Sequence, residues 1–156
     1  MILGLILITA LISGCGTDKA EVKPCKDILE SLKENGDYGF DIVYTEGDEN
    51  FDESFEFLYD FEKRLVDDSA IMFIEDGGYA DEISLFHVKE SGDVKIVREK
   101  LELRIESRLQ VFNAYKPEEA SKVSNAKVMV SGNYVALIIS SDNEMAEADI
   151  RKIIAE

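Results

Sequence analysis

The hydrophobic pattern of the chain changes its period several times. Apolar side chains recur every three or four positions between residues 94 and 113, which predicts a long helix with one buried stripe. Two runs rich in β-branched and aromatic residues precede it, at 70–74 and 83–88, with the turn-forming pair Gly77-Gly78 between them. The pattern therefore predicts two strands followed by a long helix.

A β-hairpin is predicted further along the chain. Residues 126–131 and 134–139 flank Gly132-Asn133, a two-residue loop of type II′ character. If Ser131 opposes Tyr134, the apolar residues of both strands share one face, which sets the register. The facing pairs are then Val130 with Val135, Val128 with Leu137, and Ala126 with Ile139.

Helices are predicted on either side of these strands. Residues 27–35 and 52–61 have helical spacing, and residues 142–155 form a last helix with Ser141 and Glu144 as a capping box. The order strand, strand, helix, strand, strand, helix, after two short helices, predicts the α+β class. We expect a two-layer fold in which a mainly antiparallel four-stranded sheet packs against the long helix and the C-terminal helix.

The N-terminal segment has the pattern of a targeting signal. Residues 2–12 contain no charge, but a bilayer-spanning helix needs about 20 apolar residues, so the run fits the apolar region of a signal peptide. No Lys or Arg precedes it, so either the natural start lies upstream or the terminal amine supplies the charge. The run ends in Ile12-Ser13-Gly14-Cys15, which resembles the lipobox of bacterial lipoproteins.

That resemblance implies cleavage between Gly14 and Cys15 and a diacylglycerol on the Cys15 sulfur. We then expect a signal peptide at 1–14, a lipidated tether at 15–26 and a single globular domain at 27–156. The protein would be anchored by lipid on the extracytoplasmic face of the cell membrane. The alternative is a buried N-terminal strand that ends in an ordinary cysteine.

The charge and the cysteine content limit the kinds of partner that the protein is expected to bind. The chain has 17 Lys and Arg against 33 Asp and Glu, a net charge of -16, which disfavours nucleic acid and anionic headgroups as partners. Membrane contact is therefore expected through the lipid on Cys15. A lipidated Cys15 leaves Cys25 without an intrachain partner, so we expect an idle thiol in the tether, with an intermolecular bridge as the alternative.

Three motifs resemble one bacterial family. They are Ala80-Asp81-Glu82-Ile83, the run Phe112-Asn113-Ala114-Tyr115-Lys116-Pro117-Glu118-Glu119, and Gly132-Asn133-Tyr134-Val135. Together they resemble domain-of-unknown-function family 4358, a family of bacterial lipoproteins, over residues 58–154. The resemblance implies a lipid anchor at the cell envelope and brings no established activity or catalytic residues.

Candidate catalytic and metal-binding residues are few. His87 lies in a predicted strand with no histidine or cysteine nearby in sequence, which favours a core or edge residue over a metal ligand. Asp48, Asn50 and Asp52 match the first, third and fifth positions of a calcium loop, but the glycine and the closing glutamate of that loop are missing. An acidic helix N-terminus explains the stretch more simply. We therefore predict no metal and no cofactor.

Two classes of function remain. Tyr79, Asp81 and Glu82 follow a glycine pair and form either a binding loop or a solvated turn. The first class is a non-catalytic binding or interaction module at the cell envelope. The second is a membrane-anchored, metal-dependent sensor or enzyme with a site near His87, Asp81 and Glu82.

The second face of the predicted hairpin also needs a cover. Met129 and Tyr134 lie on it, and Met72, Ile74, Phe86 and Val88 are expected to extend it over the first two strands. So large an apolar face is covered either by the two small N-terminal helices or by a partner chain. A homodimer with Met129 and Tyr134 as its anchors is the second alternative.

Overall fold

The computed structural model describes residues 22–36, 38–49 and 51–156. The predicted signal peptide and the lipidation site, Gly14 and Cys15, lie outside these residues. The helices and strands are α1 (Cys25–Asn35), β1 (Ile42–Thr45), α2 (Phe51–Tyr59), β2 (Val66–Phe73), β3 (Glu82–Val88), α3 (Val94–Tyr115), α4 (Pro117–Ser124), β4 (Lys127–Ser131), β5 (Tyr134–Ile139) and α5 (Asn143–Ala155).

The strands of the described residues form one sheet in the order β1-β2-β3-β5-β4, and every neighbouring pair is antiparallel. The α+β class and the antiparallel sheet are confirmed. The predicted hairpin register is also confirmed, since Ser131 pairs with Tyr134 and Val130 with Val135. The structure adds a fifth strand, β1, which is four residues long and half-buried throughout, and so has no clear alternation in sequence.

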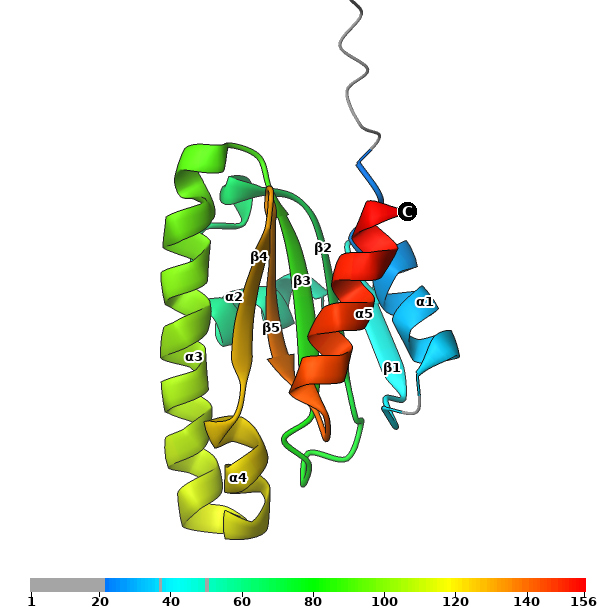
Figure 1. Ribbon diagram of the computed structural model, residues 1–156. Coiled ribbons are helices and arrows are strands. Elements are labelled where there is room, and N and C mark those ends of the chain that lie inside the picture. The colour runs from blue at the N-terminus through cyan, green and yellow to red at the C-terminus, as the bar shows by residue number, and fades with distance from the viewer. Residues whose placement is uncertain (1–21, 37, 50) are drawn as a thin grey trace, which may run out of the picture.

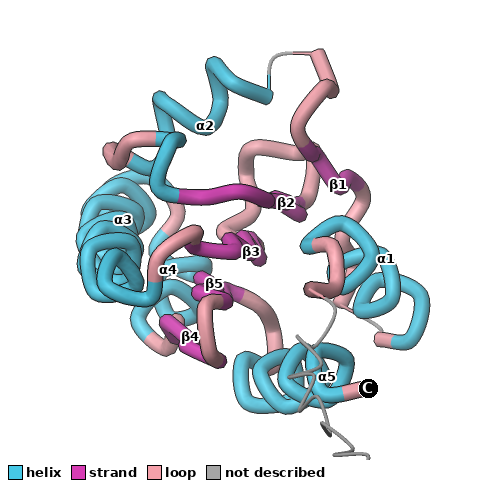
Figure 2. Tube along the Cα trace, turned by 90° about the horizontal axis from the view of Figure 1, so that it is seen from above, coloured by secondary structure: helices cyan, strands magenta, loops and turns pink. Residues whose placement is uncertain are grey.

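Helices cover both faces of the sheet (Figure 1). Seen from above, α2, α3 and α4 lie on one side of the strands, and α1 and α5 lie on the other (Figure 2). The sheet thus has helices on each face, with α5 on the face opposite α3 (Figure 2). This follows from the β-strands themselves, because β3 and β5 are buried along their whole length and present apolar residues on both faces.

The first core lies between the sheet and α2, α3 and α4. The predicted stripe of α3 faces it, with Val97, Leu101 and Phe112 buried. Phe55 of α2 packs edge-on against Phe86 of β3, with ring centroids 5.8 Å apart. The long helix therefore packs on the sheet as its periodicity predicts.

The second core lies under α1 and α5 and contains Met129 and Tyr134, which are 1% and 8% exposed. The chain's own helices thus cover this face, so these two residues are not available to a partner here. The cover is α1 with α5, whereas α2 lies on the opposite face. Phe86 and Val88 also belong to the opposite face, so their predicted place beside Met129 was wrong.

The domain begins earlier than predicted. Cys25 is the first residue of α1 and is fully buried, and burial with the nearby Asp68 carboxylate raises the pKa of its thiol. The Lys23 ammonium donates to the Ile153 carbonyl at 2.6 Å, and the Tyr134 hydroxyl donates to the Lys23 carbonyl at 2.6 Å. Residues 23–26 therefore belong to the packed domain, and Cys25 is a core residue rather than part of a tether.

Candidate functional site

The segment that joins β2 to β3 is a tightly held turn. The Gly78 amide donates to the Asp76 carboxylate at 2.9 Å, and the Tyr79 amide donates to the Asp76 carbonyl at 3.1 Å. The Lys116 ammonium, at the junction of α3 and α4, lies 4.3 Å from the centre of the Tyr79 ring. These contacts hold the turn against the end of α3.

The residues after the turn are bound to α3 and α4. The Ala80 amide donates to Glu119 Oε2 at 3.0 Å, and the Ala80 carbonyl accepts from Arg108 Nη2 at 2.8 Å. The Lys122 ammonium lies 2.5 Å from the Asp81 carboxylate and 3.0 Å from Glu119. Two of the motifs behind the family resemblance, around Ala80 and Glu119, are thus in direct contact.

Glu82 is the centre of a buried polar cluster. Arg104 binds it with two hydrogen bonds, from Nε to Oε1 at 2.8 Å and from Nη2 to Oε2 at 2.6 Å. The hydroxyls of Tyr59 and Ser84 donate to the same Oε1 at 2.8 and 3.0 Å. Burial by itself would raise the pKa of Glu82, but Arg104, helped by Arg108 and Tyr59, lowers that pKa to about 2.

Arg108 is the second arginine beside this carboxylate. Its Nη1 lies 3.5 Å from Glu82 Oε2, which accepts a closer hydrogen bond from Arg104 Nη2. Its buried Nε has no hydrogen-bond partner among the described residues. Burial, with the neighbouring Arg104 charge, lowers the pKa of Arg108 below its ordinary value. Glu82 is therefore shared by two arginines, and Arg108 is the more distant of them.

A cavity of about 230 Å³ adjoins this cluster, between the end of α2, the end of β2, the turn and α3. Apolar side chains supply much of its wall, and Glu82 and the two arginines lie on one side. The lining residues are Leu58, Ile71, Phe73, Ile74, Glu75, Gly77, Tyr79, Asp81, Glu82, Arg104 and Arg108. The predicted binding loop residues Tyr79, Asp81 and Glu82 thus line one cavity.

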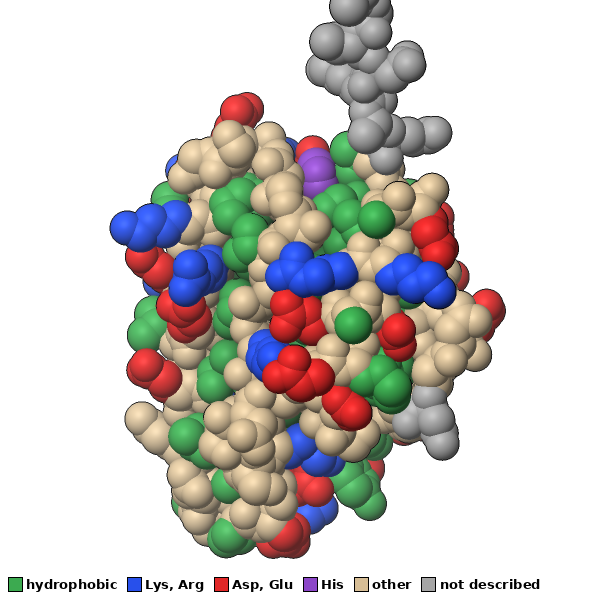
Figure 3. Space-filling view, viewed as in Figure 1, with side chains coloured by type: hydrophobic (Ala, Val, Ile, Leu, Met, Phe, Trp, Pro, Cys, Tyr) green, Lys and Arg blue, Asp and Glu red, His purple; other side chains and the backbone are tan. Residues whose placement is uncertain are grey.

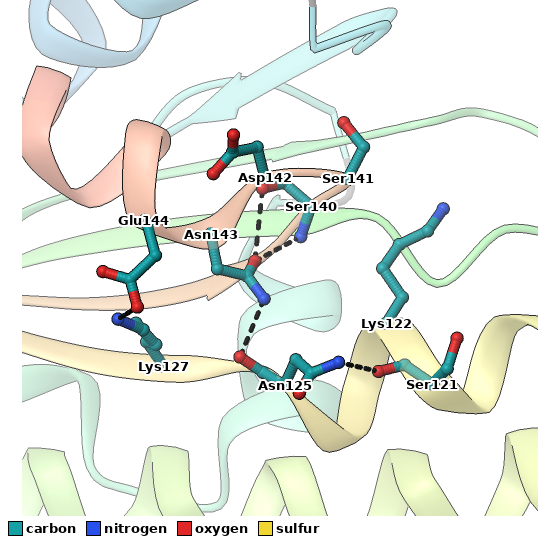
Figure 4. Close-up of a pocket in the computed structure, with 9 residues that line it drawn as sticks. All are labelled: Ser121, Lys122, Asn125, Lys127, Ser140, Ser141, Asp142, Asn143 and Glu144. Atoms are coloured by element: carbon teal, nitrogen blue, oxygen red, sulfur yellow. Dashed lines mark hydrogen bonds and ion pairs between the residues drawn. The ribbon is translucent and has the colours of Figure 1, made fainter.

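A second hollow, of about 600 Å³, lies between the end of α4 and the start of α5 (Figure 4). Its polar groups mainly bind one another. Asn143 donates to the Asn125 carbonyl at 2.8 Å and accepts from the Ser140 amide at 2.7 Å, and Lys127 pairs with Glu144. These bonds tie the α4–β4 connection to the β5–α5 connection, and we therefore place the candidate site in the smaller cavity.

His87 lies away from this cavity. Its Nδ1 is 2.6 Å from the Asp67 carboxylate, and its ring packs edge-on against Tyr134 with centroids 4.8 Å apart. It lies five positions after Glu82 along β3, a span of about 16 Å. Figure 3 shows it, in purple, at one end of the molecule. The predicted alternative site of His87, Asp81 and Glu82 is therefore not assembled.

The remaining acidic candidates have structural partners. The Asp48 carboxylate accepts from the Thr45 amide at 2.7 Å, and Asp52 pairs with Lys63, while Asn50 lies outside the described residues. Among the described residues no group of three or more His, Cys, Asp or Glu side chains is placed to hold a metal ion.

Sequence analysis missed the two arginines and Lys122. Lys95 and Arg98 of the same helix pair with Glu99 and Glu102 on its exposed face. Arg104 and Arg108 lie four residues apart beside the apolar stripe, but Arg98, next to Val97, borders the stripe as well. Sequence position therefore offered no signal that separates them from Arg98.

Comparison with known proteins gives a family and no function. No curated protein and no solved structure matches the chain. Within the described residues no helix is both long and apolar enough to cross a membrane. The model of one protein family, described as a domain of unknown function (DUF4358), matches residues 42–140. The matched residues run from β1 to the end of β5 and include α2, α3 and α4 with the cavity, while α1 and α5 lie outside them. The chain therefore belongs to the DUF4358 family of domains of unknown function.

Proposed function

We propose that this protein is a non-catalytic binding module that is held on the extracytoplasmic face of the cell membrane by lipid on Cys15. Its ligand is a small molecule that enters the cavity lined by Tyr79, Glu82 and Arg108. The single observation behind the binding role is this cavity, with an apolar wall and a fixed polar side, built on the motifs of the family.

The cavity is suited to binding because its walls are held in place before a ligand arrives. Hydrogen bonds and ion pairs from α3 and α4 fix the backbone of Ala80 and the carboxylate of Asp81. In a preformed site, ordering the side chains of the site costs little free energy when a ligand enters.

The charges of the cavity favour binding over proton transfer. A general acid or base works best with a pKa near the working pH. The pKa of Glu82 is about 2, and pairing with Glu82 raises the pKa of Arg104 above its ordinary value against the effect of burial. Both groups keep their charge at neutral pH, so they orient a ligand rather than exchange protons with it.

The lipid anchor is supported by the sequence Ile12-Ser13-Gly14-Cys15 and by the place where the packed domain begins. Within the described residues Lys23, eight positions after Cys15, already contacts the domain. A segment of this length keeps the domain close to the membrane surface, within about 30 Å at full extension.

Fractionation of a bacterial host that processes lipoproteins tests the anchor. The wild-type chain is expected with the membranes, with a lipid-modified Cys15 as its first residue by mass spectrometry. The Cys15→Ser chain is expected to be unprocessed or released from the lipid. Cys25→Ser is the matched control and should leave the lipid in place. A mature wild-type protein with an unmodified first residue other than Cys15 would refute the anchor.

A further inference from the structure

We infer that the ligand of this cavity is a small carboxylate with an apolar body of a few carbons, and that Arg108 binds its carboxylate. The inference rests on the proposed binding role of the cavity and specifies the chemical class of the ligand. It follows from the charges, the walls and the size of the cavity, in that order.

The charges favour an anion. Glu82 is the carboxylate that both arginines approach, and Arg104 takes both of its oxygens at 2.8 and 2.6 Å. Arg108 keeps one hydrogen bond, to the Ala80 carbonyl, and a longer approach of 3.5 Å to Glu82. An incoming carboxylate would give this half-buried guanidinium a closer counter-charge than Glu82, and arginine binds carboxylates with strong, charge-assisted hydrogen bonds.

The acidic residues that line the cavity do not cancel this preference. Asp81 is paired with Lys122 at 2.5 Å, and Glu75 is exposed to water at the rim. The net charge of -16 is spread over the whole chain, and exposed charges are screened over about 10 Å at moderate salt. Inside the cavity Arg108 has the weaker share of Glu82, at 3.5 Å, and is therefore the positive group best placed to accept a further counter-charge.

The walls and the volume define the rest of the ligand. Leu58, Ile71 and Phe73 offer apolar contacts on the side of α2 and β2. The volume of about 230 Å³ is below the roughly 300–1,000 Å³ of pockets that bind drug-sized ligands, so the ligand is small. Hexanoate, with about eight non-hydrogen atoms, is therefore a suitable probe.

Three probes of similar length test the inference on the purified full-length chain in detergent. Hexanoate and hexanamide carry the same five-carbon alkyl chain on a negative and a neutral head group, and hexylamine, with a six-carbon chain, carries a positive one. Ligand-observed NMR and calorimetry are expected to show saturable binding of hexanoate only. Loss of one charge-assisted contact in Arg108→Met should weaken it by about tenfold or more. Arg98→Met, an exposed residue of the same helix, should leave binding unchanged.

A filled cavity gives an independent check if Arg108→Met fails to fold. Leu58→Trp places a larger side chain in the wall and should abolish hexanoate binding. Phe57→Trp is its control, because Phe57 is the next residue of α2 and is 86% exposed.

The outcomes separate the two proposals. If hexanamide or hexylamine binds as tightly as hexanoate, and Leu58→Trp abolishes that binding, the cavity binds ligands but the carboxylate class is wrong. If hexanoate binding survives both Arg108→Met and Leu58→Trp, the assigned residues are wrong. If none of the three probes binds at up to about 10 mM, where even a weak millimolar complex saturates, both proposals fail.

Discussion

Replacement of Glu82 by glutamine would remove the charge that Arg104 and Arg108 share. The Glu82 side chain is 4% exposed and the Arg104 side chain 10%, so water cannot replace the lost partner easily. Removing one partner of a buried ion pair costs about 3–5 kcal/mol of unfolding free energy, because the other charge stays buried. We expect Glu82→Gln to be destabilised by that amount at pH 7.

The pH dependence of this loss identifies the cause. The pKa of Glu82 falls from an ordinary 4.5 to about 2 on folding, which corresponds to about 3 kcal/mol. Since the folded pKa is the lower one, this stability is present above pH 4.5 and is lost as the pH falls toward 2. Glu82→Gln cannot lose it, so the gap between the two proteins should narrow by about 3 kcal/mol over that range.

Urea denaturation of both proteins between pH 7 and pH 2.5 measures the gap directly. Titration of all other groups affects both proteins alike and cancels in the difference. Glu102→Gln is the matched control, since Glu102 pairs with Arg98 at 2.9 Å on the exposed side of the same helix. It should cost less than about 1 kcal/mol. A gap that stays constant from pH 7 to pH 2.5 would show that Glu82 is not held ionised by the arginines.

Three further predictions test the packing of α1 and α5. Met129→Glu places a charge under these helices and should lower the unfolding free energy by at least about 3 kcal/mol in urea titrations. Met145→Glu, at a 46% exposed site, is the control and should change that free energy little. Equal effects of the two substitutions would contradict the burial of Met129. In the Cys15→Ser chain the buried Cys25 thiol should react with a thiol reagent only after denaturant is added, and rapid labelling of the native chain would place it outside the core. Asp142→Ala removes the carboxylate that accepts a hydrogen bond from the Met145 amide at 2.9 Å, and it should cost about 1 kcal/mol of stability by thermal unfolding. Asp142→Asn should be nearly neutral. An alanine variant as stable as the wild type would refute the cap.

Local patterns were sufficient for most secondary structure. The Gly132-Asn133 turn and the strict alternation around it set the hairpin register, because a shift by one residue would move every apolar side chain to the other face. Gly132 has a φ of +57°, which glycine adopts without strain. The stripe of α3 was equally clear over 22 residues. The cap of α5 was placed one residue early, at Ser141 instead of Asp142, because both residues are good caps.

The tertiary structure decided which face each helix covers and which charges are buried. An apolar stripe shows that a helix packs, but it does not name the partner surface, so α1 and α2 could not be assigned to opposite faces from sequence. The candidate site could not be assigned from sequence for the same reason. Arg104 and Arg108 differ from Arg98 only in what lies opposite them, and Glu82 reaches them through the pairing of β3 within the sheet. Sequence periodicity reports the environment averaged over one element, whereas a buried ion pair depends on two elements meeting.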